Sequence, residues 1–218
     1  MGIIGISGKV QSGKDLAGSM TQFLLSQAHR DYQRSYEEWL MMEPQYRTTY
    51  EIHKFADPLK EIVCTMMGCK RSDLEDINFK NSLLPEYWRE NSHLPKDCTY
   101  RMFLQMLGSD IFNKYVHPNT WINSLMGRYD SKIKPVRGSF KYIPNWIITD
   151  VRFPNEVAAI ENRGGIVIRL ERDSCPKLDH ISETALDEFS FKHIIYNNGN
   201  KADLLGNLNN VLTTVKIC

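Results

Sequence analysis

The sequence predicts an α/β protein with three layers, in which a mostly parallel sheet lies between helices on both faces. Short apolar runs rich in Ile and Val alternate along the chain with longer segments of helical periodicity. This alternation favours parallel strands that are joined by helical crossovers. A chain of 218 residues has the length of one such domain with room for an inserted subdomain.

The N-terminal half is expected to hold two strands, each followed by a helix. The expected elements are a strand at 2–7, a helix at 13–29, a surface-like helical stretch at 30–50, a strand at 51–55 and a helix at 57–67. Asp57 is a candidate N-cap of the last helix, because Pro58 suits a first helical turn. Residues 70–100 are polar with scattered aromatic residues and prolines, which indicates an insertion of short helices and loops.

The second half of the chain continues the alternation after two more helices. Phe103, Leu104, Leu107 and Ile111 would share one face of the first of them. The expected elements are helices at 101–114 and 118–130, a basic loop at 131–144, a strand at 146–150, a helix at 154–162, a strand at 166–170, a polar loop at 171–181, a short helix at 182–189, a strand at 193–196 and a helix at 201–216.

The turn between the first strand and helix reads Gly8-x-x-x-x-Gly13-Lys14, the spacing of a phosphate-binding P-loop. Its backbone N–H groups can surround phosphate oxygens at a helix N-terminus, and Lys14 would reach the β- and γ-phosphates of a nucleoside triphosphate. A tight turn that needs glycine for backbone reasons alone is the alternative. The candidate ATP-binding residues are Gly8, Lys9, Ser12, Gly13, Lys14 and Asp15.

Two carboxylates are candidate Mg²⁺ ligands. Asp15 stands where Ser or Thr normally offers a hydroxyl to the ion, and Asp150 ends an apolar strand, beyond which ligands of open α/β sheets bind. Arg152 could place its planar guanidinium on a phosphate in the same cleft. The alternatives are that Asp150 caps the helix after Pro154 and that Arg152 is a surface residue.

Arg101 and Gln105 are four residues apart, so they would share one helix face. A guanidinium and an amide there could grip the phosphate and the base edge of an acceptor, and a solvated face is the alternative. The loop 171–181 carries Arg172 and could close over a transferring phosphoryl group as a lid. His180, Ser182 and Glu183 follow it, and for Ser182 an N-cap role is an equal alternative.

Composition excludes some classes of function. The net charge of +1 favours binding to neither nucleic acid nor an anionic membrane. No apolar run approaches the length of a membrane-spanning helix, which is about 20 residues. The five scattered cysteines fit reduced thiols, and Cys64, Cys69, His93 and Cys98 are poorly spaced for zinc. The first strand begins too early to leave room for a targeting peptide, so a cytoplasmic location is expected.

Several segments together resemble the deoxynucleoside monophosphate kinases of large DNA phages. The matching segments are GKVQSGKD, FADPLK, R-x-x-L-Q-x-L-G-S-D, TDVRFPNE and H-x-S-E, and the resemblance is weakest at 30–50 and 70–100. It implies a P-loop kinase fold, ATP as donor, Mg²⁺ and a deoxynucleoside 5′-monophosphate (dNMP) as acceptor. It places Lys14 and Asp15 in the P-loop, Arg101 and Gln105 on the acceptor-side helix, Asp150 and Arg152 in a strand-end Asp-x-Arg, and Arg172 in the lid.

One P-loop kinase domain over 1–218 is therefore expected, with a helical acceptor-binding insertion at about 68–145 and a lid at about 171–182. The expected catalytic residues are Lys14, Asp15, Arg152 and Arg172, and the expected acceptor-binding residues are Arg101, Gln105, Asp150 and Arg152. ATP and a dNMP are the expected partners, without nucleic acid or a membrane. A homodimer stays open, and a phage-encoded chain would act in the host cytoplasm.

The acceptor decides what Asp15 would do. A monophosphate has a second pKa of about 6 and is ionised at pH 7, so a dNMP needs no general base and Asp15 is expected to hold Mg²⁺ directly or through water. An alcohol acceptor would make Asp15 attractive as a base. The Gly-Lys-Asp ending is shared with animal-type phosphomevalonate kinases. A phosphomevalonate- or dephospho-coenzyme-A-type kinase is therefore the alternative enzyme, and a nucleotide-binding protein without turnover is the alternative of another class.

Overall fold

The chain forms two compact units, each with a hydrophobic core of its own. The computed structural model describes residues 2–26, 33–43, 50–135, 141–176 and 181–215. The larger unit comprises Met1–Phe55 and Arg128–Cys218, and the smaller one comprises Ala56–Gly127.

The larger unit is built on a five-stranded sheet in which all neighbouring strands are parallel. The strands are, in their order across the sheet, β2 (Glu51–His53), β5 (Trp146–Val151), β1 (Ile3–Gly8), β6 (Ile166–Glu171) and β7 (His193–Tyr196). The central strand β1 pairs Ile4 with Ile147 on one side and with Ile166 on the other. Because the strands are parallel, their carboxyl ends share one edge, and the glycine-rich turn leaves β1 at that edge.

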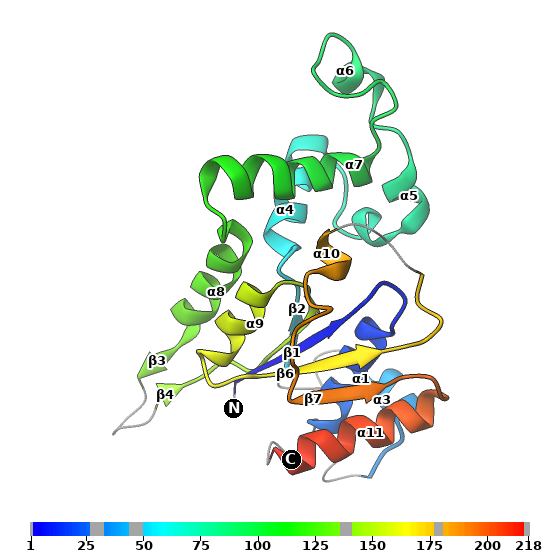
Figure 1. The fold of residues 1–218 in the computed structure, drawn as a ribbon, viewed down its shortest axis with the longest axis vertical. Helices are drawn as coiled ribbons and strands as arrows, with labels where there is room; N and C mark the ends of the chain where they lie inside the picture. Colours follow the sequence, from blue (N-terminus) through cyan, green and yellow to red (C-terminus); the bar gives the residue numbers. More distant parts are fainter. Residues whose placement is uncertain (1, 27–32, 44–49, 136–140, 177–180, 216–218) are drawn as a thin grey trace. The chain divides into compact units, whose positions relative to one another are not determined.

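Helices cover both faces of this sheet. α1 (Lys14–Leu24), α3 (Tyr36–Leu40) and α11 (Lys201–Thr214) pack on one face, and α9 (Pro154–Glu161) packs on the other (Figure 1). On the first face, Ile4 and Ile6 join a core with Met20 of α1. On the second face, a Cβ atom at Gly5 would lie 2.7 Å from Ile160 Cδ1 of α9. The three-layer α/β prediction is therefore confirmed.

The smaller unit is helical. Its elements are α4 (Asp57–Met67), the 3₁₀ turn η2 (Asp73–Glu75), α5 (Ile77–Asn81), α6 (Glu86–Arg89), α7 (Tyr100–Gln105), the π-helix η3 (Met106–Val116) and most of α8 (Thr120–Lys132). Its core joins Val63, Leu74 and Phe103 from three of these elements. The short helical elements between residues 70 and 100 agree with the short helices predicted there.

Two N-terminal predictions were wrong in part. α1 ends at Leu24 rather than near residue 29, while residues 27–29 lie outside the described residues. The stretch that was predicted to be surface-like contains α3, whose Tyr36 and Trp39 are buried and contact the ring of Phe23. Two aromatic side chains of α3 therefore belong to the core of the larger unit.

The helix predicted at 101–114 is an α-helix only as far as Gln105 and continues as η3. Leu107 of its predicted apolar face is buried, but Ile111 is 38% exposed. A π-helix turns less per residue than an α-helix, so a face counted at α-helical spacing is displaced along it. The prediction of a single apolar face was therefore wrong at Ile111.

Four local expectations also differ from the structure. Asp57 is the first residue of α4, and the residue at the N-cap position is Ala56. Ser182 lies inside a short helix rather than before it. The helix predicted at 182–189 is α10 (Ile181–Thr184), and the loop predicted at 131–144 contains the hairpin strands β3 (Lys134–Pro135) and β4 (Lys141–Tyr142).

Candidate active site

The glycine-rich turn between β1 and α1 contains residues with positive φ. Gly13, the N-cap residue of α1, has a φ of 95°, and a Cβ there would also lie 2.7 Å from Asn197 Nδ2, so only glycine fits. Gln11 has a φ of 64°, which is uncommon for a residue with a side chain. The Ser12 amide donates to Lys9 O at 3.1 Å, and Asn197 Nδ2 donates to Ser12 O at 2.9 Å. These two hydrogen bonds restrain the backbone of the loop between Lys9 and Gly13.

Lys14 folds back onto the loop. Its Nζ donates to the carbonyl oxygens of Gly8 and Lys9 at 2.7 and 2.6 Å. Burial, followed by the positive charge of Arg152, lowers the pKa of Lys14 to about 8, against the opposing effect of nearby carboxylates. The ammonium group is therefore charged at neutral pH and lies next to the loop.

A carboxylate from α10 also reaches the loop. Glu183 Oε2 accepts a hydrogen bond from the Val10 amide at 2.7 Å, and Glu183 Oε1 forms an ion pair with Arg152 Nη1. The side chain of Glu183 is 6% exposed. Ser182 Oγ accepts from the same guanidinium nitrogen at 3.4 Å. Arg152, which follows β5, therefore lies close enough to Lys14 to affect its charge. Glu183 lies between Arg152 and the loop and contacts both.

The two predicted metal ligands come from a helix and a strand: Asp15 lies in the first turn of α1, and Asp150 lies near the carboxyl end of β5. Asp15 Oδ1 accepts from Thr149 Oγ1 at 3.3 Å and pairs with Lys54 Nζ at 2.9 Å. Asp150 Oδ1 accepts from the Phe55 amide at 2.7 Å. The carboxylate and hydroxyl oxygens are hard donors that suit Mg²⁺. The described residues contain no group of three or more His, Cys, Asp or Glu that could hold a metal by themselves.

Glu156 supports the segment that carries Arg152. Its Oε2 accepts from the amides of Arg152 and Phe153 at 2.6 and 3.0 Å at the start of α9. Burial, and then the negative charge of Asp150, raises the pKa of Glu156 to about 8. Asp150 does not serve as the cap of α9, because Glu156 fills that role from within the helix.

The remaining predicted acceptor and lid residues are exposed or lie outside the described residues. Arg101 and Gln105 both lie on α7 in the smaller unit, are exposed, and Arg101 Nε donates to Asn81 Oδ1 at 2.8 Å. Arg172 is exposed in the turn after β6. His180 lies outside the described residues.

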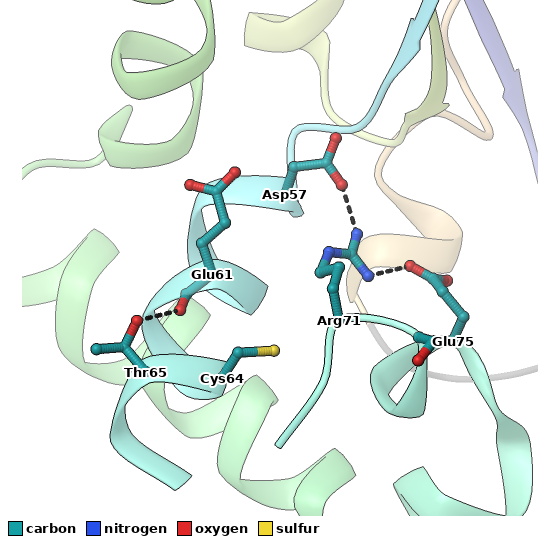
Figure 2. Close-up of a pocket in the computed structure, with 7 residues that line it drawn as sticks. Asp57, Glu61, Cys64, Thr65, Arg71 and Glu75 are labelled. Atoms are coloured by element: carbon teal, nitrogen blue, oxygen red, sulfur yellow. Dashed lines mark hydrogen bonds and ion pairs between the residues drawn. The ribbon is translucent and has the colours of Figure 1, made fainter. Parts of the chain in front are cut away.

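The smaller unit contains an open pocket of about 600 Å³. It is lined by Asp57, Glu61, Cys64, Thr65, Arg71, Ser72 and Glu75. Arg71 lies between two of the carboxylates, and its guanidinium pairs with Asp57 Oδ1 at 2.5 Å and with Glu75 Oε1 (Figure 2). Three carboxylates against one guanidinium make this pocket unsuited to a phosphate group. None of the predicted acceptor-binding residues lines it.

Comparison with known protein families decides the assignment. A model of the family described as deoxynucleotide monophosphate kinase matches residues 30–208. The chain belongs to this family. It is an ATP-dependent phosphotransferase whose small-molecule substrates are ATP and a deoxynucleotide monophosphate, and kinases usually also need a divalent metal ion. No curated protein matches the chain.

Membership in the deoxynucleotide monophosphate kinase family favours the nucleotide acceptor over the phosphomevalonate and coenzyme A alternatives. The glycine-rich loop precedes the matched residues, so this comparison does not cover it. None of the described helices is long and apolar enough to cross a membrane.

Glu156, Lys54 and Asn197 contact residues of this candidate site and were not predicted. Glu156 had a detectable signal, because it is the third residue of a helix that begins with Pro154, as in a capping box. Lys54 and Asn197 directly follow β2 and β7. Their contacts with the loop and with α1 depend on the order of strands in the sheet, for which the sequence has no local signal.

Proposed function

We propose that this kinase binds ATP at the loop from Gly8 to Asp15 and transfers the γ-phosphoryl group to a dNMP, giving ADP and dNDP. The observation that carries the proposal is the convergence of the loop amides, Lys14 and Arg152 at the carboxyl edge of the sheet. An ionised acceptor oxygen forms the new bond to the γ-phosphorus while the bond to the ADP oxygen breaks. No proton needs to be removed.

The proposed roles follow from charge. The loop amides would hold the β- and γ-phosphates, and Lys14 and Arg152 would neutralise the charge that spreads over the transferred group. Arg172 would add a third cation when the proposed lid at about 171–182 closes. Arg101, Gln105, Asp150 and Arg152 would position the acceptor, with the helical insertion at about 68–145 as its binding region.

Asp15 and Asp150 are the residues proposed to hold Mg²⁺, directly or through water. The fit rests on the oxygen-donor set around Asp15, which includes the Thr149 hydroxyl. When bound, the ion would neutralise phosphate charge. Asp15 is paired with Lys54, so Lys54 would exchange its partner for a phosphate or move aside when the ion binds. Nucleic acid is not expected as a substrate, and the cytoplasmic location and oligomeric state stay predictions.

The test is a coupled ADP-release assay with each of the four dNMPs, the matching ribonucleoside monophosphates and phosphomevalonate. Release of ADP that depends on at least one dNMP, together with the corresponding dNDP, is expected. Lys14→Ala should lose most of this activity, while Lys201→Ala, an exposed lysine at the start of α11, serves as the matched control. Turnover with phosphomevalonate alone would contradict the proposal.

A further inference from the structure

A carboxylate of the chain itself occupies the loop that is proposed to bind ATP. Glu183 accepts the Val10 amide hydrogen at 2.7 Å and pairs with the guanidinium of Arg152. An amide from the glycine-rich loop and an arginine are the donors that a nucleotide phosphate would use. Glu183 is the only one of these three groups that carries negative charge, and it is almost fully buried.

Lys14, the remaining donor that is proposed to bind phosphate, also contacts the loop itself. Lys14 Nζ donates to two carbonyl oxygens of the loop rather than pointing away from it. A second contact ties the same segment of chain to the loop, because Lys9 Nζ pairs with Asp187 Oδ2 at 2.9 Å. Two residues of the segment from Glu183 to Asp187 therefore bind the loop, Glu183 through the Val10 amide and Asp187 through the Lys9 side chain.

We propose that Glu183 is an internal substitute for a nucleotide phosphate, and that ATP binding displaces its carboxylate from Val10 and Arg152. This inference rests on the proposed ATP site. A carboxylate and a phosphate cannot share these donors, because two anions at hydrogen-bond distance repel each other strongly. Each ATP molecule must therefore compete with Glu183, and the movement of Glu183 carries α10 away from the filled loop.

The competition has a measurable consequence for affinity. In Glu183→Gln the charge is lost while the shape is kept, so the protein's own competitor is weakened. We expect the variant to bind ATP and inorganic pyrophosphate about tenfold more tightly than the unaltered chain, since a charged hydrogen-bond partner is lost from the free state only. Glu188→Gln, which changes an exposed glutamate five residues away, is the matched control and should leave both affinities unchanged.

Isothermal titration of both ligands measures these affinities in the full chain. Equal or weaker binding by Glu183→Gln overturns the inference. Unchanged affinity with a lower kcat also overturns it, because Glu183 would then be a residue that positions Arg152 in the loaded enzyme. If the unaltered chain binds ATP but transfers no phosphoryl group, the proposed function fails, while the comparison of the two variants still decides the role of Glu183.

Thermal unfolding separates displacement from a merely structural role. Without ligand, Glu183→Gln should unfold at a lower temperature, because it lacks the buried ion pair. With saturating ATP the difference should disappear, since the carboxylate of the unaltered chain has then already left the loop. A deficit of the same size with and without ATP overturns the inference.

Discussion

Lys14 combines a partly buried position with a charge that the proposed reaction needs. Its pKa is lowered to about 8, first by burial and then by Arg152. The chemistry of phosphoryl transfer depends on the protonated ammonium group, because only that form neutralises phosphate charge. The activity of the free enzyme should therefore be sensitive to pH in a range where an ordinary lysine is fully charged.

We predict that kcat/KM for ATP falls as the pH rises through about 8, the pKa of Lys14 in the free enzyme. The Lys14→Arg variant should have a lower kcat/KM, but its kcat/KM should not decrease in this pH range, because a guanidinium keeps its charge. Initial rates between pH 6.5 and pH 9.5, roughly one and a half units on either side of the midpoint, measure both profiles. The same midpoint in Lys14→Arg would assign the pH dependence to another group.

Substitutions of Asp15 test its proposed role as a magnesium ligand. Asp15→Asn removes a charged oxygen ligand, so we expect about a tenfold higher Mg²⁺ concentration for half-maximal rate. Asp15→Ser supplies the hydroxyl that is usual at this position of a P-loop. Its Mg²⁺ concentration for half-maximal rate should therefore lie between those of the unaltered chain and Asp15→Asn. Rates at fixed ATP and varied free Mg²⁺ provide the measurement, with the exposed Asp97→Asn as control. Full activity of Asp15→Ser at an unchanged Mg²⁺ requirement would rule the role out.

Glu156 is a buried acid whose pKa is raised to about 8. The folded protein therefore holds a proton that the unfolded chain releases near pH 4.5, the ordinary pKa of a glutamate side chain. This stability is fully present below pH 4.5 and is lost as the pH rises through about 8, with a slope of at most about 1.4 kcal/mol per pH unit.

Glu156→Gln should flatten this dependence, because an uncharged amide oxygen can still accept from the amides of Arg152 and Phe153. Urea unfolding at pH 5, 7 and 9 is the measurement. The variant should lose less stability than the unaltered chain between the first and the last pH. A parallel loss in both proteins would mean that Glu156 is ionised throughout.

At the scale of elements, the π-helix η3 depends on side chains that bond its carbonyl groups. Trp121 Nε1 donates to Gly108 O at 3.0 Å, and Thr120 Oγ1 donates to Phe112 O at 3.2 Å. A long π-helix is rare, so the surrounding core must stabilise it. Hydrophobic periodicity predicted a helix here correctly, but the apolar residues are too few to separate an α-helical from a π-helical period.

Trp121→Phe should destabilise the protein by about 1–2 kcal/mol, because the buried Gly108 carbonyl loses its donor while the aromatic ring is kept. Trp88→Phe is the matched control, since Trp88 packs on Phe103 in the same core and its indole N–H has no partner among the described residues. Chemical denaturation measures both. Equal effects of the two changes would show that the hydrogen bond to Gly108 contributes nothing.

At the scale of the whole molecule, the sheet order places the site. The order β2-β5-β1-β6-β7 puts β1 between strands that come much later in the chain, and the ends of β2, β5 and β7 meet the loop or α1 through Lys54, Thr149 and Asn197. Ligands of open α/β sheets bind at such an edge. Binding of ATP should therefore stabilise this larger unit.

We expect ATP at a hundred times its Kd to add about 2.7 kcal/mol to the free energy of unfolding. Adenosine, which lacks phosphates, should add much less, because the proposed contacts are all to phosphate oxygens. Thermal unfolding with each ligand measures the difference. Equal stabilisation by the two ligands would place the main binding energy on the base and not on the glycine-rich loop.

The sequence alone determined the three-layer α/β class, the bounds of α4, and the loop around Lys14. These depend on local signals: apolar runs, helical periodicity and the spacing of glycines. The predictions made from the sequence were wrong where tertiary contacts override such local signals. α3 carries two glutamates beside the buried Tyr36 and Trp39, so its composition suggested a surface helix.

Which side chains meet at the loop depends on how the strands and helices are arranged in space. Glu183 follows Val10 by 173 positions, and Lys54 reaches Asp15 from the end of another strand. Contacts of this kind arise because parallel strands bring their carboxyl ends to one edge, whatever their distance along the chain. The loop motif itself is local and could be recognised in the sequence, whereas the carboxylate that contacts it lies 173 positions further along the chain.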